Sequence, residues 1–432
     1  MFIFNFNYVI LFKQGDCVMK TKKLFKENTY LKETDAVILE VFPFEGHKAV
    51  ITDRTVFFPE GGGQPWDTGT VVFKEGNGAS YDVIKVIEKG GELIHVIDTK
   101  DEIPEGSECH LRINWERRFD NMQRHTGEHI FTGVFDREFG GTNRGFHMGD
   151  EYMTIDISLE DRAKVDTITW DMVKKAELLS NEIIYQDLPM IVRHFDSYED
   201  ACNEPMRKPL TVEEDITLVG FGSTDYDWAC VACCGTHLRS TAQVGLIKAF
   251  KLESNKGMYR IYFEAGRRAF IRYQEEMETL HTLGRKLSAG TEDILAKYDA
   301  QSEKNSAKSY QLSLLKKEII SRESARIVSA LEAGSYDNGL AVERYNILSL
   351  DDLTQLGRAL SPHIKKLAFL IHEPSTTVLL VSDGKVNCGK LVKENAGIYN
   401  GKGGGNDIQA RAIFTKMEYV ETFIDLIEKH LR

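Results

Sequence analysis

Positive charge is scarce in this 432-residue chain, which carries 54 Lys and Arg against 66 Asp and Glu and a formal net charge of −12. This balance argues against a protein that coats nucleic acid through bulk positive charge, so any contact with RNA has to be local. Long hydrophobic runs are missing as well. The opening MFIFNFNYVILF lacks a basic flank and a small-residue cleavage site, and about a dozen residues are too few to span a bilayer. We therefore expect no membrane contact, and residues 1–18 to be a leader that is disordered or dispensable.

Cysteine is also sparse and unevenly placed. Seven cysteines occur, and three of them, Cys230, Cys233 and Cys234, lie within five residues. In a chain of this length such a cluster suits a metal or redox site better than a disulfide framework, and a reducing cytoplasm is the expected location.

The order of composition changes indicates an α+β protein with several domains. Residues 19–113 contain short β-branched runs separated by Gly and charged turns, which predict a β-barrel-like subdomain. Residues 114–265 begin with an apolar stripe at helical spacing over Trp115–Phe139 and continue as a mixed α/β domain. Residues 266–335 are charged, proline-free and dotted with Leu and Ile, which favours a helical linker or a homodimerisation arm. Residues 336–432 read as a small C-terminal α/β domain with a glycine-rich loop before the last helix.

Two pairs of metal-binding residue types lie far apart in the sequence. His125 and His129 are four apart in the predicted helix, so both project from one face. Cys233 and His237 flank a turn that contains glycine. Three imidazole nitrogens and one sulfur suit one tetrahedral Zn²⁺ per chain.

Other uses of these residues stay open at this point. Cys230 and Cys233 form a C-x-x-C, so Cys230 competes as a ligand or as a redox partner. Cys234 reads more readily as a packed thiol. His125-x-x-Glu128-His129 also fits the H-x-x-E-H pattern of zinc metallopeptidases, with Glu128 as the candidate catalytic base.

A glycine-rich segment follows a strand-like run. In FPEGGGQP, the consecutive Gly61, Gly62 and Gly63 permit positive φ and a close approach of backbone to a ligand, and Gln64 offers both a donor and an acceptor. A tight connection between strands is the competing interpretation.

FPEGGGQP, the H-x-x-x-H of RHTGEH and the CCGTH segment resemble, in order and separation, the editing domain of alanyl-tRNA synthetase. NGKGGGNDIQARA resembles the C-terminal domain of that synthetase, so the likeness reaches the end of the sequence. No room remains for an aminoacylation domain. The chain is therefore similar to the long form of the alanyl-tRNA editing proteins, which act in trans.

This resemblance implies that His125, His129, Cys233 and His237 bind zinc, and that Thr55 and Gln64 lie beside the aminoacyl group. It also implies hydrolysis of mischarged tRNA(Ala), chiefly Ser-tRNA(Ala) and also Gly-tRNA(Ala). Cys234 stands where the family commonly has glycine, a departure that a negative φ would tolerate.

Basic residues around the C-terminal glycines suggest contact with tRNA. Lys402, Gly403, Gly404, Gly405 and Arg411 would let the backbone approach phosphates, and a loop that caps the last helix is the competing interpretation. A non-catalytic, zinc-structured RNA-binding protein is the third function class that the sequence leaves open, beside the esterase and the metallopeptidase.

Overall fold

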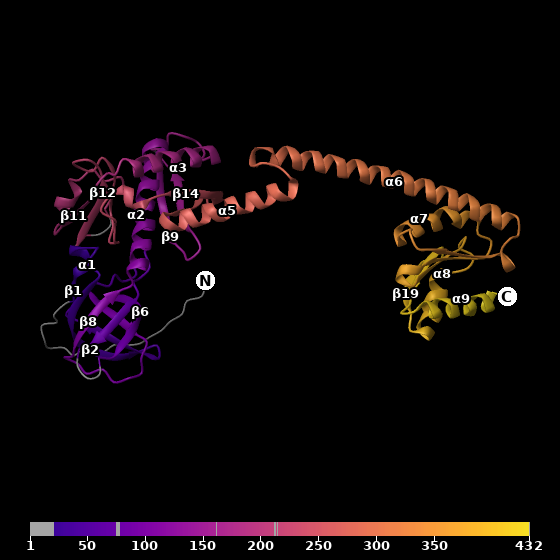
Figure 1. The fold of residues 1–432 in the computed structure, drawn as a ribbon, viewed down its shortest axis with the longest axis horizontal. Coiled ribbons are helices and arrows are strands. Elements are labelled where there is room, and N and C mark those ends of the chain that lie inside the picture. Colours follow the sequence, from indigo (N-terminus) through magenta and orange to yellow (C-terminus); the bar gives the residue numbers. More distant parts are fainter. Residues whose placement is uncertain (1–20, 75–77, 161, 211–212, 214, 432) are drawn as a thin grey trace. The chain divides into compact units, whose positions relative to one another are not determined.

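The computed structural model describes residues 21–74, 78–160, 162–210, 213 and 215–431 (Figure 1). The expected leader, residues 1–18, lies outside these described residues. The chain divides into two compact units, Met1–Leu280 and His281–Arg432. Within the described part of the chain, no helix is long and apolar enough to cross a membrane.

The N-terminal part of the first unit is a closed barrel, as the short β-branched runs predicted (Figure 1). Six antiparallel strands close in the order β2-β3-β7-β6-β5-β8. Their bounds are β2 (Glu33–Phe44), β3 (His47–Thr52), β5 (Gly69–Phe73), β6 (Ser80–Lys89), β7 (Glu92–Ile97) and β8 (Glu108–Ile113). In β8, the alternate residues Cys109, Leu111 and Ile113 are buried in the barrel core, which is the period of two that a barrel requires.

Three short elements connect the barrel to the rest of the unit. Strand β1 (Lys22–Lys23) pairs in parallel with β4 (Arg54–Thr55), and α1 (Leu24–Glu27) follows β1 directly. The glycine-rich segment begins a few residues after β4.

Helix α2 (Trp115–Phe139) is the central element of the unit, and its bounds are those that the apolar stripe predicted. The side chain of Asn114 accepts a hydrogen bond from the backbone of Arg117 and caps the start, and Gly140, with φ 66°, ends the helix. Both histidines of the H-x-x-x-H sequence are buried on it, together with their apolar neighbours.

Two antiparallel sheets surround this helix. One has the order β14-β15-β10-β9 and the other β11-β12-β13. Their bounds are β9 (Gly141–Met148), β10 (Met153–Leu159), β11 (Met190–Phe195), β12 (Ile216–Phe221), β13 (Trp228–Ala232), β14 (Ile247–Asn255) and β15 (Met258–Ala265), with α3 (Trp170–Tyr185), α4 (Tyr198–Cys202) and the 3₁₀ turn η1 (Thr241–Val244) between them. Ile130 of α2, Ile155 of β10, Val173 of α3 and Phe263 of β15 share one core.

The charged segment is helical, as predicted, and is interrupted between two long helices. Helix α5 (Gly266–Leu287) and helix α6 (Ile294–Glu332) are separated by a turn that contains η2 (Thr291–Asp293). Ile320 and Ile327 of α6 belong to a core within the second unit, whereas Leu312, Leu315 and Ile319 are exposed.

The second unit contains a five-stranded sheet in the order β16-β17-β18-β20-β19, in which β16 and β17 are parallel and the other neighbours antiparallel. Its elements are η3 (Asp337–Gly339), β16 (Leu340–Tyr345), α7 (Leu350–Leu360), η4 (Ser361–His363), β17 (Leu367–His372), η5 (Glu373–Ser375), β18 (Thr377–Val381), α8 (Cys388–Asn395), η6 (Ala396–Tyr399), β19 (Lys402–Gly405), β20 (Gln409–Ile413) and α9 (Met417–Leu431). These elements give residues 337–431 a mixed α/β architecture.

The prediction of a loop at the C-terminal glycines was wrong for Lys402–Gly405. These residues form strand β19, which pairs antiparallel with β20. A Cβ atom on Gly403 would lie 2.1 Å from the Arg411 carbonyl oxygen, and one on Gly405 would lie 2.2 Å from that of Gln409. The glycines therefore allow β19 and β20 to approach each other closely. A run of glycines in the sequence is compatible with such a strand as well as with a loop.

Candidate metal centre and glycine loop

The two distant pairs of ligand residues meet in one cluster. Within the described residues, His125, His129, Cys233 and His237 each offer a ligand atom, and these atoms all lie within 4.8 Å of one another. The Cys233 Sγ atom lies 3.4 Å from Nε2 of His125 and 3.4 Å from Nε2 of His237. Such separations suit donors that surround a single ion at the usual Zn–N and Zn–S bond lengths.

The chemistry of the cluster also fits a metal ion. Burial lowers the pKa of His125 to about 4 and holds the pKa values of His129 and His237 well below the ordinary value, so all three imidazoles are neutral donors. The Nδ1 atoms of His129 and His237 are buried and have no hydrogen-bond partner among the described residues. Burial raises the pKa of the Cys233 thiol, and a bound cation would replace its proton.

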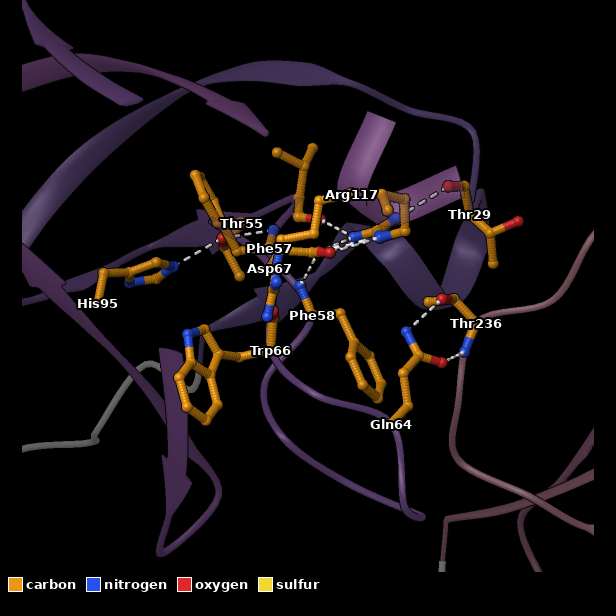
Figure 2. A network of polar contacts seen from close by, with 12 residues as sticks. Thr29, Thr55, Phe57, Phe58, Gln64, Trp66, Asp67, His95, Arg117 and Thr236 are labelled. Carbon is orange, nitrogen blue, oxygen red and sulfur yellow. Dashed lines mark hydrogen bonds and ion pairs between the residues drawn. The ribbon is translucent and has the colours of Figure 1, made fainter. Parts of the chain in front are cut away.

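Gln64 orients the His125 ring through a hydrogen bond on the side away from Cys233. Its Oε1 accepts from the backbone N–H of Thr236 at 3.0 Å and lies 2.9 Å from Nδ1 of His125, while its Nε2 donates to the Thr236 hydroxyl at 2.8 Å. Figure 2 shows both contacts between Gln64 and Thr236. Because Oε1 only accepts, Nδ1 of His125 carries the proton, and Nε2 has the lone pair that a metal ion could use. Gln64 is fully buried.

Glycine at position 235 is required by the same histidine. A Cβ atom there would lie 2.2 Å from Cε1 of His125, so any side chain would displace the ring. Glycine in the CCGTH segment thus admits His125 from α2.

The glycine-rich segment forms a tight turn beside the cluster. Gly61 and Gln64 exchange backbone hydrogen bonds at 3.1 and 3.0 Å, and Gly62 and Gly63 have positive φ values of 58° and 83°. A Cβ atom on Gly63 would lie 2.7 Å from the ring of Phe146, which itself stacks on His125. The turn is therefore packed against the residues that surround the ligands.

A cavity of about 320 Å³ opens onto the cluster. Its lining includes Gly62, His125, Glu128, His129, Asn143, Phe146, Arg207, Lys208, Asp215, Thr217, Cys233 and Cys234. The carboxylate of Glu128 accepts a hydrogen bond of 2.8 Å from Asn143, and burial raises the pKa of Glu128. Glu128 of the H-x-x-E-H sequence therefore faces the same space as the metal ligands.

Thr55 lies outside this lining. It is fully buried, its Oγ1 lies 2.8 Å from Nε2 of His95, and it accepts from the backbone N–H of Phe57 at 3.0 Å (Figure 2). Nδ1 of His95 lies 3.3 Å from the Val50 carbonyl oxygen, so Nδ1 is the donor there and Nε2 accepts from the Thr55 hydroxyl. Burial lowers the pKa of His95 to about 4 and keeps the ring neutral.

The other two cysteines of the sequence cluster have different surroundings. Cys230 is buried among Leu218, Tyr226 and their neighbours and is not one of the four clustered ligands. Cys234 is exposed, lines the cavity and has no positive φ, so the departure from glycine brings no backbone strain.

Several residues of the site carry no motif. His95 stands between the apolar Ile94 and Val96 of a strand that is buried throughout, and no motif marks it in the sequence. Asn143, Phe146, Arg207 and Lys208 line the cavity without any pattern that would have singled them out. The C-terminal residues Lys402–Gly405 and Arg411 are exposed on β19 and β20 of the second unit.

Comparison with known proteins agrees with the motifs. Residues 6–117 match the family model of class II (A) tRNA synthetases, and residues 216–262 match the second additional domain of threonyl and alanyl tRNA synthetases. The chain is 29% identical over 428 residues to the alanyl-tRNA editing protein AlaX-L of Pyrococcus horikoshii, which covers 95% of this chain and 99% of that relative. The predicted resemblance is confirmed.

Alanine–tRNA ligases match over a similar share of this chain. Identity is 28% with the ligase of Pyrobaculum calidifontis and 27% with that of Pyrococcus abyssi, over 91% and 95% of this chain. These matches cover 42% and 44% of the two ligases, so the chain spans less than half of their length.

Proposed function

We propose that this chain removes wrong amino acids from tRNA(Ala) in trans, by zinc-dependent hydrolysis of the ester bond, chiefly in Ser-tRNA(Ala) and also in Gly-tRNA(Ala). The observation that carries the proposal is the convergence of His125, His129, Cys233 and His237 beside the glycine turn. The similarity to AlaX-L over nearly the whole of both chains supplies the substrate class. Charged tRNA places this activity in the cytoplasm.

The glycine turn provides a donor for charge that develops on the ester oxygen. The N–H of Gly61 is used within the turn, whereas that of Gly62, which lines the cavity, has no partner among the described residues. A backbone N–H held at the cavity wall can stabilise an oxyanion without reorganising. We assign this role to Gly62, with Gly61 and Gly63 shaping the turn.

A zinc ion at the cluster would supply a positive charge that polarises the ester or orients the amino group of the substrate. His125, His129, Cys233 and His237 together would fill a tetrahedral shell, which favours organisation of the pocket over activation of a water molecule. Glu128, oriented by Asn143, is the acceptor available for a proton from the attacking water.

Thr55 belongs in this proposal as a buried residue of β4, the strand that precedes the glycine turn. Its hydroxyl is held by His95 and by the backbone of Phe57, so Thr55→Val would leave both without a partner. We expect this variant to lower the preference for the seryl over the alanyl ester while zinc content stays unchanged.

One experiment separates the proposed esterase from its rivals. The purified protein is incubated with Ser-tRNA(Ala), Ala-tRNA(Ala) and a peptide library, and we expect ester loss from Ser-tRNA(Ala) alone. Cleavage of peptides would favour the metallopeptidase, which the position of Glu128 in the cavity makes the second candidate. Retention of tRNA without turnover would favour a non-catalytic RNA-binding protein.

The remaining parts of the chain would bring the substrate to this centre. Lys402 and Arg411 on β19 and β20 are exposed and are proposed to contact tRNA phosphates.

Leu312, Leu315 and Ile319 are exposed on α6 at spacings of three and four residues, which suits a homodimer contact within residues 266–335. Sedimentation velocity of the full chain and of Leu315→Glu tests that contact.

A further inference from the structure

Two basic side chains, Arg207 and Lys208, line the same cavity as the candidate metal ligands His125, His129 and Cys233. Neither forms an ion pair with a carboxylate anywhere in the described part of the chain. The carboxylates that share the cavity wall have other partners, because Glu128 accepts from Asn143 and Asp215 pairs with Lys26. The cavity therefore presents two cations without a direct ion-pair partner among the described residues, although the Glu128 carboxylate acts on both through space.

Arg207 is fixed in place by its neighbours. Its backbone N–H donates to the Cys230 carbonyl oxygen at 3.0 Å, next to the segment that carries the ligand Cys233. Its Nη2 donates to the hydroxyl of Thr132, on α2, at 2.7 Å. Its Nε is buried and lacks a hydrogen-bond partner among the described residues. A guanidinium that is held at one nitrogen and unsatisfied at another is ready for an acceptor with two oxygens.

The environment of both cations carries an electrostatic cost. Burial lowers the pKa of Arg207 and of Lys208, and the positive charge of Arg207 lowers that of Lys208 further. An anion between them would satisfy the unpaired donor and remove this repulsion.

We propose that Arg207 and Lys208 form a phosphate-binding subsite for the tRNA 3′ end, which takes the phosphodiester that precedes the terminal nucleoside. This inference rests on the proposed function. A seryl or glycyl group offers a neutral side chain and a cationic amino group, and neither suits two cations. The phosphodiester is the anionic part of an aminoacyl-tRNA that lies nearest the ester, and Arg and Lys are the side chains that bind such groups.

The test compares two substrates that share the ester and differ in phosphate. Arg207→Gln and Lys208→Gln are assayed with Ser-tRNA(Ala) and with 3′-O-seryl-adenosine, which has no phosphate. We expect KM for the tRNA to rise on the order of tenfold at unchanged kcat, and the slope of log KM against log salt to fall by about 1 per charge removed. Hydrolysis of seryl-adenosine should fall by a clearly smaller factor than hydrolysis of Ser-tRNA(Ala), because only the tRNA offers the phosphate.

Lys174→Gln is the matched control, because Lys174 on α3 loses the same charge and lies outside the cavity lining. Arg207→Lys keeps the positive charge and should retain most of the tRNA affinity. It serves as the second variant in case Arg207→Gln does not fold. Equal losses on both substrates, or unchanged KM for the tRNA in both Gln variants, would overturn the subsite. Failure of the wild-type protein to hydrolyse either ester would instead overturn the proposed function.

Discussion

Two cysteines of the same C-x-x-C sequence have different surroundings, and only one of them lies among the candidate metal ligands. Cys230 and Cys233 belong to one C-x-x-C, yet Cys233 lies 3.4 Å from two imidazole nitrogens and Cys230 packs against Leu218 and Tyr226. We predict that Cys233→Ala loses zinc and deacylation together, because it removes one of four donors, whereas Cys230→Ala keeps both. Elemental analysis with the deacylation assay measures this, and full zinc occupancy in Cys233→Ala would exclude the ligand set.

Gln64 is predicted to set zinc affinity without touching the metal. Gln64→Ala would leave Nδ1 of His125 and the backbone N–H of Thr236 without acceptors, so His125 would lose its fixed orientation. Loss of such outer partners costs roughly 10–100-fold in metal affinity or activity. Competition with a chromophoric chelator measures the affinity. The exposed Gln301→Ala should match the wild type, and equal affinities for Gln64→Ala and wild type would contradict the role.

Among the elements, α2 and the segment around the glycine turn are joined by a buried ion pair. Arg118 of α2 binds Asp67 and donates to the carbonyl oxygens of Val56 and Thr29, and Asp67 also accepts from the backbone of Phe58. Figure 2 labels Asp67, Phe58 and Thr29 of this network together with Gln64. The pair fixes the turn to the helix that carries His125 and His129.

Breaking that pair should destabilise the first unit. Asp67→Asn leaves the Arg118 charge buried without its counter-ion, so we expect the free energy of unfolding to fall by about 3–5 kcal/mol. Urea denaturation followed by tryptophan fluorescence measures the change, with Trp66 and Trp115 in the affected region. Glu108→Gln removes a partner from an exposed pair with Lys74 and should change stability little. Similar midpoints for the two variants would show that the pair does not hold the turn.

The whole molecule consists of two compact units, and the candidate metal centre lies entirely in the first. Removal of zinc with a chelator should therefore lower the unfolding temperature of the first unit and abolish deacylation, because bound metal stabilises the folded form by mass action. The transition of the second unit should stay in place. Differential scanning calorimetry of the full chain with and without chelator measures both transitions, and an unshifted scan with full activity would exclude a zinc requirement.

Local pattern was enough for several elements and for the choice of candidate metal ligands. The bounds of α2, the strand-rich character of the barrel and the helical character of α5 and α6 follow from hydrophobic periodicity, composition and turn residues, which act over a few neighbours. His125, His129, Cys233 and His237 were recognisable because thiolate and imidazole at these spacings have few competing uses. The amino-acid order therefore sufficed to propose the succession of elements and the candidate donor set.

Tertiary structure decided everything that depends on which distant segments meet. No shared sequence pattern links the residues that packing brings together here. Thr55 contacts His95, and Arg118 pairs with Asp67. Arg207 and Lys208 line the same cavity as the candidate metal ligands. The same holds for the C-terminal glycines, where the carbonyl groups of β20 distinguish a strand from a loop. Periodicity records only which face of an element is apolar, whereas hydrogen bonds, ion pairs and close approaches depend on the partner that packing brings to that face.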